Sequence, residues 1–540
     1  MTQPEVFTRK TSGLVRVMSP NAAFVYNVLT MGLIFPWTYL WGPWAFPGSS
    51  LALGILIATV IEVFIAGAYV YLAAAMPRSG GDYVFQSRVL GGGLGYTAVM
   101  SGFVIWILQW VALSGWLFAV LGVAPFFQAM GVHLQNQGMI EVGNWALSPT
   151  GIVVISLLLA IVTTLVLVRG LKLYVLIQHF LFAATLIAFA LILWIFFTTP
   201  TSQFVERLNA FAMGLGQGTD FYNFILQDVK AAGWDTQKAF SLVATLGIAP
   251  IAWTSLQWAT YSVEQGSEIQ GAESRRNQWF ILVGSCVFTG VLLALLAVAE
   301  EKAIGKDFLS AVSASYYGQV KAEGSAGMGS IAPFPNVLAM AITASPIVIF
   351  LIALGYVANA WQVTFNCFIG MTRNMVAMAL DRTLPDWVAR VHPRLHSPVN
   401  AHVAYLVGSI AWILAYNYVP GWIGYTLGVT FACGYVFALS TLAAALLPYR
   451  AKQLYEASGA TATFAGLPLV TVLGVVGFVL GGAMVLSFMF VPALGLTSRT
   501  AYAIVFGIII LSALMYVVAK NYNSGRGINI ALAFKAVPPQ

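Results

Sequence analysis

Long apolar segments that contain almost no charged residues constrain this chain more than any other feature. A helix needs about 20 consecutive apolar residues to cross a lipid bilayer, and runs of this length recur along the whole sequence. Charged residues make up only 8% of the 540 residues, whereas a soluble globular chain has about 25%. We therefore predict an all-α integral membrane protein with twelve transmembrane helices, near residues 19–40, 51–76, 95–126, 150–169, 172–197, 240–264, 279–299, 336–368, 400–416, 421–448, 466–492 and 499–519.

The distribution of basic residues predicts the orientation of these helices. The chain carries 25 Lys and Arg against 18 Asp and Glu, a net charge of +7. When the N terminus is placed inside, most of the basic residues fall on that side, as the positive-inside rule requires. We therefore expect both termini in the cytoplasm, and no binding of nucleic acid. No short apolar region at the N terminus ends at a small-residue cleavage site, and an unprocessed helical bundle favours the plasma membrane.

Two of the apolar segments are interrupted by helix-breaking residues. Residues 241–264 are long enough to span a bilayer, yet Gly247 and Pro250 punctuate them, and hydroxyl and amide side chains follow. Residues 30–37 contain Gly32 and Pro36. Non-helical backbone is tolerated inside a membrane where it lines a cavity, and two interrupted segments, each opening a set of five spans, are typical of inverted-repeat transporters. Two ordinary spans kinked by proline are the alternative.

The sequence carries no motif for catalysis or for metal binding. The three cysteines, Cys286, Cys367 and Cys433, lie inside apolar spans without the spacing of a disulfide framework or a metal site. A nucleophile elbow, a phosphate-binding loop and a His/Asp/Glu metal pattern are missing as well. We therefore predict that the protein is not an enzyme and holds neither a metal nor a cofactor.

Three loop motifs resemble those of a known family. Residues 373–385 read RNMVAMALDRTLP, with VHPR at 391–394 and Ser397-Pro398 after them; residues 76–85 read MPRSGGDYVF; and Gly170-Leu171-Lys172 is followed by Gln178. The chain thereby resembles the amino acid–polyamine–organocation (APC) transporter superfamily, whose signature loop is R-x-x-x-x-M-A-x-D-[GR]-x-L-P and whose second motif is P-r-S-G-G-x-Y.

The resemblance implies a 5+5 inverted-repeat core in which helices 1 and 6 are discontinuous and a bundle rocks against a scaffold. The transport core would occupy residues 19–448, between a cytoplasmic N-terminal segment at 1–18 and two C-terminal helices, 11 and 12, at 449–520. A cytoplasmic tail, 521–540, would follow. The implied function is secondary active transport of an amino acid or a related amine by alternating access, coupled to protons or working by exchange.

The resemblance also implies where the substrate binds. In the family the backbone N–H groups at the break of helix 1 hold the substrate carboxylate, and carbonyl groups of helices 1 and 6 hold its amine. The family's G-[ST]-G break corresponds here to residues 30–32, and its F-x-x-G-F-E pattern aligns with residues 253–257, where serine replaces glycine and glutamine replaces glutamate. These departures favour an apolar or aromatic amino acid, or an amine held by cation–π contact. The predicted substrate residues are Thr30, Met31, Gly32, Leu33, Trp106, Gln109, Trp253, Thr254, Ser255 and Gln257.

A second group of residues is predicted to couple or gate transport. Some proton-coupled relatives carry a lysine where this chain has Thr185, so Glu62 and His179 become the intramembrane candidates for a proton. A satisfied structural pair for Glu62, and a headgroup-facing position for His179, are the alternatives. Asn359 opens a polar stretch that also holds Gln362, Thr364 and Asn366, suited to sodium, to substrate or to interhelical hydrogen bonds.

The cytoplasmic motif itself is predicted to act as a hinge and gate latch. Arg373 and Asp381 lie eight residues apart, so on one helix they share a face. The outside loops at 198–238 and 300–335 are either gates or inert surface. The expected partners are a small-molecule substrate, a proton or sodium ion and the lipid bilayer, with the oligomeric state open. A membrane nutrient sensor without transport and a sodium-coupled carrier of another solute are the alternative functions.

Overall fold

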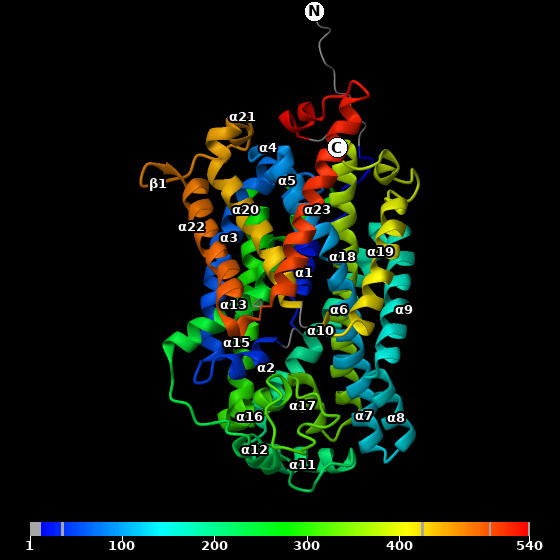
Figure 1. Ribbon diagram of the computed structural model, residues 1–540, viewed down its shortest axis with the longest axis vertical. Helices are drawn as coiled ribbons and strands as arrows, with labels where there is room; N and C mark the ends of the chain where they lie inside the picture. The colour runs from blue at the N-terminus through cyan, green and yellow to red at the C-terminus, as the bar shows by residue number, and fades with distance from the viewer. Residues whose placement is uncertain (1–11, 34–36, 423–425, 496–497, 538–540) are drawn as a thin grey trace, which may run out of the picture.

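The computed structural model describes residues 12–33, 37–422, 426–495 and 498–537. Long helices run side by side along its length (Figure 1). One end of the bundle, here called the α4 end, carries α4 (Gly81–Val89) and α21 (Lys452–Ala457). The opposite end, here called the α12 end, carries the short helices α11 (Thr201–Gly214), α12 (Phe221–Ala231), α16 (Lys306–Tyr316) and α17 (Pro335–Ala341).

Ten helices among the described residues are long and apolar enough to cross a membrane. Seven are single helices: α3 (Leu51–Ala75), α9 (Pro149–Val168), α10 (Leu171–Thr198), α18 (Pro346–Leu380), α19 (Val399–Tyr418), α22 (Leu469–Phe490) and α23 (Arg499–Ser524). The other three are the composite spans Gly92–His133, Leu242–Glu264 and Arg275–Ile304. The first and last of these hold α5 (Gly92–Val99), η1 (Met100–Ile105), α6 (Leu108–Leu117), η2 (Phe118–Val123) and α7 (Ala124–His133), then α14 (Arg275–Gln278), η5 (Trp279–Gly284) and α15 (Ser285–Ile304).

The two remaining predicted spans, 19–40 and 421–448, border residues outside the described ranges. The first contains α1 (Pro20–Met31) and the start of α2 (Trp37–Ala45), and the second contains most of α20 (Thr426–Arg450). The mostly helical membrane architecture is therefore confirmed, while the count of twelve and the inverted repeat remain predictions.

Both interrupted segments leave the α-helix near the middle of their predicted spans. Helix α1 ends at Met31, and Gly32 adopts a φ of 74°, a left-handed value that favours glycine. The second segment stays α-helical through Pro250 as α13 (Leu242–Leu256) and then tightens into the 3₁₀ helix η3 (Gln257–Glu264). In this second segment the interruption therefore falls after Gly247 and Pro250, the helix-breaking residues of the sequence.

The predicted span at 336–368 divides differently. Helix α17 ends at Ala341, and α18 begins only at Pro346, where the Ser345 side chain accepts a hydrogen bond from the Val348 N–H at 3.5 Å. A capping serine before proline is a strong start signal for a helix. The 35 residues of α18 exceed the roughly 20 that a bilayer requires, so this helix carries the cytoplasmic-type motif beyond the apolar core to the α4 end (Figure 1).

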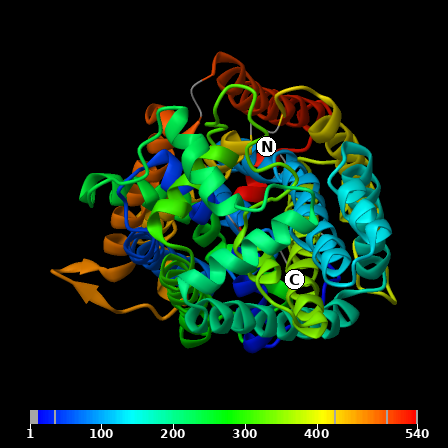
Figure 2. The ribbon, with the colours of Figure 1, turned by 90° about the horizontal axis from the view of Figure 1, so that it is seen from below.

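The two long loops predicted outside the membrane fold into the helices of the α12 end. Figure 2 looks onto this end, where short helices lie across the ends of the long ones. Helix α12 buries Phe221, Ile225 and Val229 along one face, and its Tyr222 ring stacks on Phe308 of α16 with centroids 4.0 Å apart. The apolar face of this amphipathic helix therefore packs α12 against the rest of the α12 end. A small hairpin of β1 (Thr463–Phe464) and β2 (Leu467–Pro468) projects from the side of the bundle.

The described segments at the two ends of the chain both lie at the α4 end. Met18 forms an isolated bridge with Ile269, and the short C-terminal helix η9 (Ile530–Lys535) packs near α4. These two described end segments therefore lie on one side of the bundle, and the cytoplasmic location of both termini remains a prediction.

Replacement of Gly80 tests the turn that opens α4. Gly80 has a φ of 77°, and an added Cβ would lie 2.6 Å from the Ala377 Cβ of α18. Gly459 has a comparable φ of 64°, with nothing within 4 Å of such a Cβ. Left-handed backbone costs an alanine about 1–2 kcal/mol, so Gly459→Ala should lose only that amount. Gly80→Ala should lose clearly more, measured as thermal unfolding in detergent. Equal losses would show that α18 does not restrict this turn.

Candidate functional site

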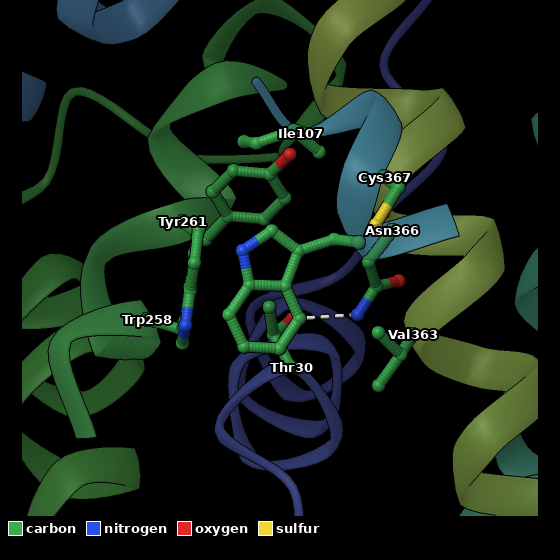
Figure 3. A pocket seen from close by; sticks show the side chains of 8 residues that line it. Thr30, Ile107, Trp258, Tyr261, Val363, Asn366 and Cys367 are labelled. Carbon is green, nitrogen blue, oxygen red and sulfur yellow. Dashed lines mark hydrogen bonds between the residues drawn. The ribbon is translucent and has the colours of Figure 1, made fainter. Parts of the chain in front are cut away.

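A small cavity lies between the two interrupted segments and helices α6 and α18 (Figure 3). All eight side chains that line it are buried, and the space inside that the centre of a water molecule can occupy is about 20 Å³. This volume holds about one water, so the cavity is too small for an amino acid in this structure. Its wall is formed by Thr30 of α1, Ile107 and Trp110 at the start of α6, Trp258 and Tyr261 of η3, and Val363, Asn366 and Cys367 of α18.

The cavity is aromatic on one side and polar on the other. The Trp258 ring meets Trp110 edge to face at 5.5 Å and Tyr261 at 5.3 Å, the arrangement that aromatic pairs prefer. Opposite them, the Asn366 amide donates a 2.6 Å hydrogen bond to the Thr30 hydroxyl (Figure 3). None of the eight lining residues is charged. A charged group of a ligand would therefore depend on aromatic faces and backbone dipoles.

The 3₁₀ geometry of η3 brings its two aromatic residues to the cavity. Residues three apart lie on one face of a 3₁₀ helix, and Trp258 and Tyr261 have this spacing. A buried asparagine of α1 holds η3 in place: Asn27 Oδ1 accepts from the Ser262 N–H at 2.9 Å, and its amide donates to the Ile281 carbonyl at 3.1 Å.

A second buried asparagine satisfies the backbone at the break of α1. The Asn359 amide donates to the Leu29 carbonyl at 2.9 Å, and its Oδ1 accepts from the Leu33 N–H at 3.1 Å. These are groups that a continuous helix would pair internally, and a buried unpaired polar group costs about 1–3 kcal/mol. Asn359 of α18 thus stabilises the interruption of α1.

Amide and hydroxyl groups continue from the cavity into α10. Tyr174 donates to Gln178 Oε1 at 2.6 Å and to Asn366 Oδ1 at 3.1 Å, and the Gln362 amide donates to Tyr174 and, at 2.7 Å, to Asn366. The Gln178 amide donates to the Ala22 carbonyl at 2.9 Å. This network ties α1, α10 and α18 together without a charged side chain.

The residues predicted to bind substrate occupy several different places. Thr30 lines the cavity, and Met31, Gly32 and Leu33 form the adjacent break. Trp106 packs edge to face on Trp412, and Gln109 accepts from the indole of Trp422 at 2.6 Å. Neither of them lines the cavity, and their substrate roles remain predictions.

The helix-six residues also lie outside the cavity wall. The Trp253 indole donates to Glu62 at 2.7 Å. Thr254 donates to the Ile251 carbonyl, Ser255 is buried, and the Gln257 amide donates to the Thr254 carbonyl at 3.3 Å. The cavity instead takes Trp258 and Tyr261, which the prediction missed because it followed the family pattern that aligns with residues 253–257. Trp110 and Asn366 were recognisable as polar or aromatic residues in apolar runs.

The coupling candidates lie apart from one another. Glu62 is fully buried in α3, and its Oε1 has no hydrogen-bond partner among the residues that the structure describes. His179 is exposed on α10 and contacts the Val175 carbonyl. Thr185 donates to the carbonyls of Leu181 and Gly355, at 2.8 and 3.3 Å. Their roles in coupling remain predictions.

Buried ion pairs close the α4 end. Arg373 holds Glu268 with two hydrogen bonds of 2.8 and 2.9 Å, and Arg88 binds Asp381 at 2.7 Å. Asp381 also accepts from Tyr83 at 2.9 Å. Helix α18 ends at Leu380, so Asp381 is its C-terminal cap residue. Arg373 and Asp381 engage different partners. Arg373 therefore joins α18 to the segment after η3, while Asp381 joins it to α4.

A double-mutant cycle tests the Arg373–Glu268 pair. Glu268→Gln leaves the Arg373 charge buried, and removal of one partner of a buried pair costs about 3–5 kcal/mol. The double variant Glu268→Gln/Arg373→Gln should lose much less than the sum of the two single losses, measured as unfolding in detergent. Additive losses would show that the two side chains are not energetically coupled.

Comparison with known protein families agrees with this geometry. The family model described as "Amino acid permease" matches residues 22–535, nearly the whole chain. No curated protein sequence matches the chain. The family model covers both interrupted segments, the cavity residues and the loops at the α4 end. The chain is therefore a multi-pass membrane protein of the amino acid permease family in the APC superfamily, a family of amino acid transporters rather than enzymes.

Proposed function

We propose that this permease is a secondary active transporter that moves an amino acid or a related amine by alternating access, with the cavity between α1, α6, η3 and α18 as its substrate site. The observation that carries the proposal is the position of this cavity at both helix interruptions. Interrupted helices offer unpaired backbone groups and helix-end dipoles to a ligand in the middle of a membrane. We further propose the 5+5 core at 19–448, helices 11 and 12 at 449–520, and a plasma-membrane location with cytoplasmic termini.

The lining residues favour an apolar or aromatic substrate. Trp110, Trp258 and Tyr261 supply ring surface, and Val363 and Ile107 extend the apolar wall. An ammonium group is attracted to the faces of such rings and to the carbonyl end of α1, which carries the negative end of the helix dipole. A carboxylate suits the N-terminal end of α2, where the dipole is positive. The closed, water-sized cavity corresponds to an occluded conformation that must expand to accept substrate.

Uptake into proteoliposomes tests transport directly. A panel of labelled amino acids and amines is offered under an inward proton gradient, an inward sodium gradient or no gradient. We expect uptake of apolar or aromatic amino acids driven by protons, or exchange without a gradient. Uptake driven by sodium alone would support the alternative sodium-coupled carrier. Binding of these solutes without movement would instead support a nutrient sensor.

Truncation of Trp258 tests the position of the substrate site. Trp258→Ala removes ring surface between Trp110 and Tyr261, and losing an aromatic contact of about 1.5 kcal/mol corresponds to a roughly tenfold fall in kcat/KM. Trp258→Phe should retain most of the activity. Trp194→Ala, at an indole that is 60% exposed on α10, is the matched control and should transport normally. Unchanged transport by Trp258→Ala would place the substrate elsewhere.

A further inference from the structure

Two fully buried carboxyl groups meet at the α4 end without a cation. Asp82 is the second residue of α4, and Glu264 is the last residue of η3. The two residues are in direct contact, because the Asp82 N–H donates to Glu264 Oε1 at 3.4 Å.

Neutral groups surround this pair on every packed element. Tyr69 of α3 donates to Asp82 Oδ1 at 2.5 Å, Ser440 of α20 donates to the same oxygen, and the Asn374 amide of α18 donates to Glu264 Oε2 at 2.7 Å. Tyr261 of η3 is the other titratable group that interacts with Glu264.

The charged groups nearby are already committed to other partners. Arg373 binds Glu268, and His402 of α19 lies against Arg373. Arg88 binds Asp381, together with Tyr83. Neither arginine bonds to Asp82 or Glu264 in the described part of the chain. These two arginines therefore give the pair no ionic compensation.

The carboxyl pair itself lacks one donor, because Asp82 Oδ2 has no hydrogen-bond partner among the described residues. Asn374 Oδ1, which is equally buried beside Glu264, has none in that part of the chain either and lies outside the pair. Two carboxylate oxygens cannot hydrogen-bond to each other unless one of them carries a proton. A proton held between the two carboxyl groups supplies the missing donor.

The energetics point the same way. An unpaired buried carboxylate costs several kcal/mol, and a second like charge beside it raises the cost further. Burial raises the pKa of Asp82, although hydrogen bonds from Glu264, Ser440 and Tyr69 oppose that effect. One proton on the pair removes one of the two charges, as in other carboxyl pairs that share a site.

We propose that Asp82 and Glu264 together bind one proton that holds the α4 end closed and that must leave before this end opens. This inference rests on the proposed transport function, and it adds a bound proton to the contact at the α4 end that opens during transport. Glu264 ends the helix whose Trp258 and Tyr261 line the cavity, and its carbonyl accepts from the Gly80 N–H at 2.9 Å. Ionisation of both carboxyls makes α4 and η3 repel each other, so the open form binds fewer protons than the closed form.

Infrared spectroscopy tests proton binding without any transport. A carboxyl that keeps its proton at neutral pH shows a carbonyl stretch distinct from that of a carboxylate. The purified protein should lose part of this band in Asp82→Asn/Glu264→Gln. The exposed control Glu273→Gln should keep the whole band. An unchanged band in the double variant would overturn the proposal even if no substrate is ever found.

Substrate exchange between equal pools tests the gate. With the same pH on both faces of the proteoliposome, wild-type exchange should slow as the pH falls, by at most tenfold per pH unit for one proton. The double variant, which mimics the protonated pair, should exchange slowly at every pH, and Glu273→Gln should follow the wild type. A double variant that keeps the wild-type slope would overturn the proposal. So would a sodium dependence at fixed pH that the double variant loses, since it would assign a metal ion to the pair.

Discussion

The interruption of α1 depends on how its released backbone groups are satisfied away from water. Inside an apolar bundle every unpaired N–H or C=O group must find a partner, and a helix can end there only if another element supplies one. Asn359 supplies a partner on both sides of the break, to the Leu29 carbonyl and to the Leu33 N–H. The side chain thereby fixes α18 against α1, and the cavity forms on the side of α1 where Thr30 meets Asn366.

Amides rather than charges organise the middle of the molecule. Asn27, Asn366, Gln178 and Gln362 each join two or more helices through donors and acceptors on one side chain. Such groups cost less to bury than ions and can be fully satisfied by backbone and hydroxyl partners. The cavity wall carries no charged side chain, which suits a ligand that brings both of its own charges into the site.

Buried ion pairs lie instead at the α4 end, where α4, α18 and the segment after η3 meet. Arg373 and Glu268 join α18 to the chain after η3, and Arg88 and Asp381 join α4 to the end of α18. Gly80 allows α4 to begin in contact with α18, because its left-handed backbone and its missing side chain permit the close approach to Ala377. The proposed proton on Asp82 and Glu264 would sit in the same contact, so its loss would act on all of these elements at once.

The sequence by itself determined the class of the protein, because composition and run length reflect the bilayer directly. The apolar runs predicted the membrane helices, and the loop motifs indicated the APC superfamily, as the family match confirms. Gly32 and Pro36 predicted an interruption where α1 ends, whereas Gly247 and Pro250 predicted one that the structure places later, at Gln257. The site was only partly predictable. Thr30 was identified from its place beside Gly32, but Trp253 turns to Glu62 instead of the cavity.

Only the tertiary structure decided which side chains face the cavity and which carboxyls lack a cation. The change to a 3₁₀ helix at Gln257 rotates Trp258 and Tyr261 inward, and no propensity in the sequence marks that change of period. In the same way, Arg373 and Asp381 look like one helix face until the end of α18 at Leu380 separates them. Pairing of buried polar groups is a property of neighbouring helices, and residues distant in sequence, such as Asp82 and Glu264, meet only after folding.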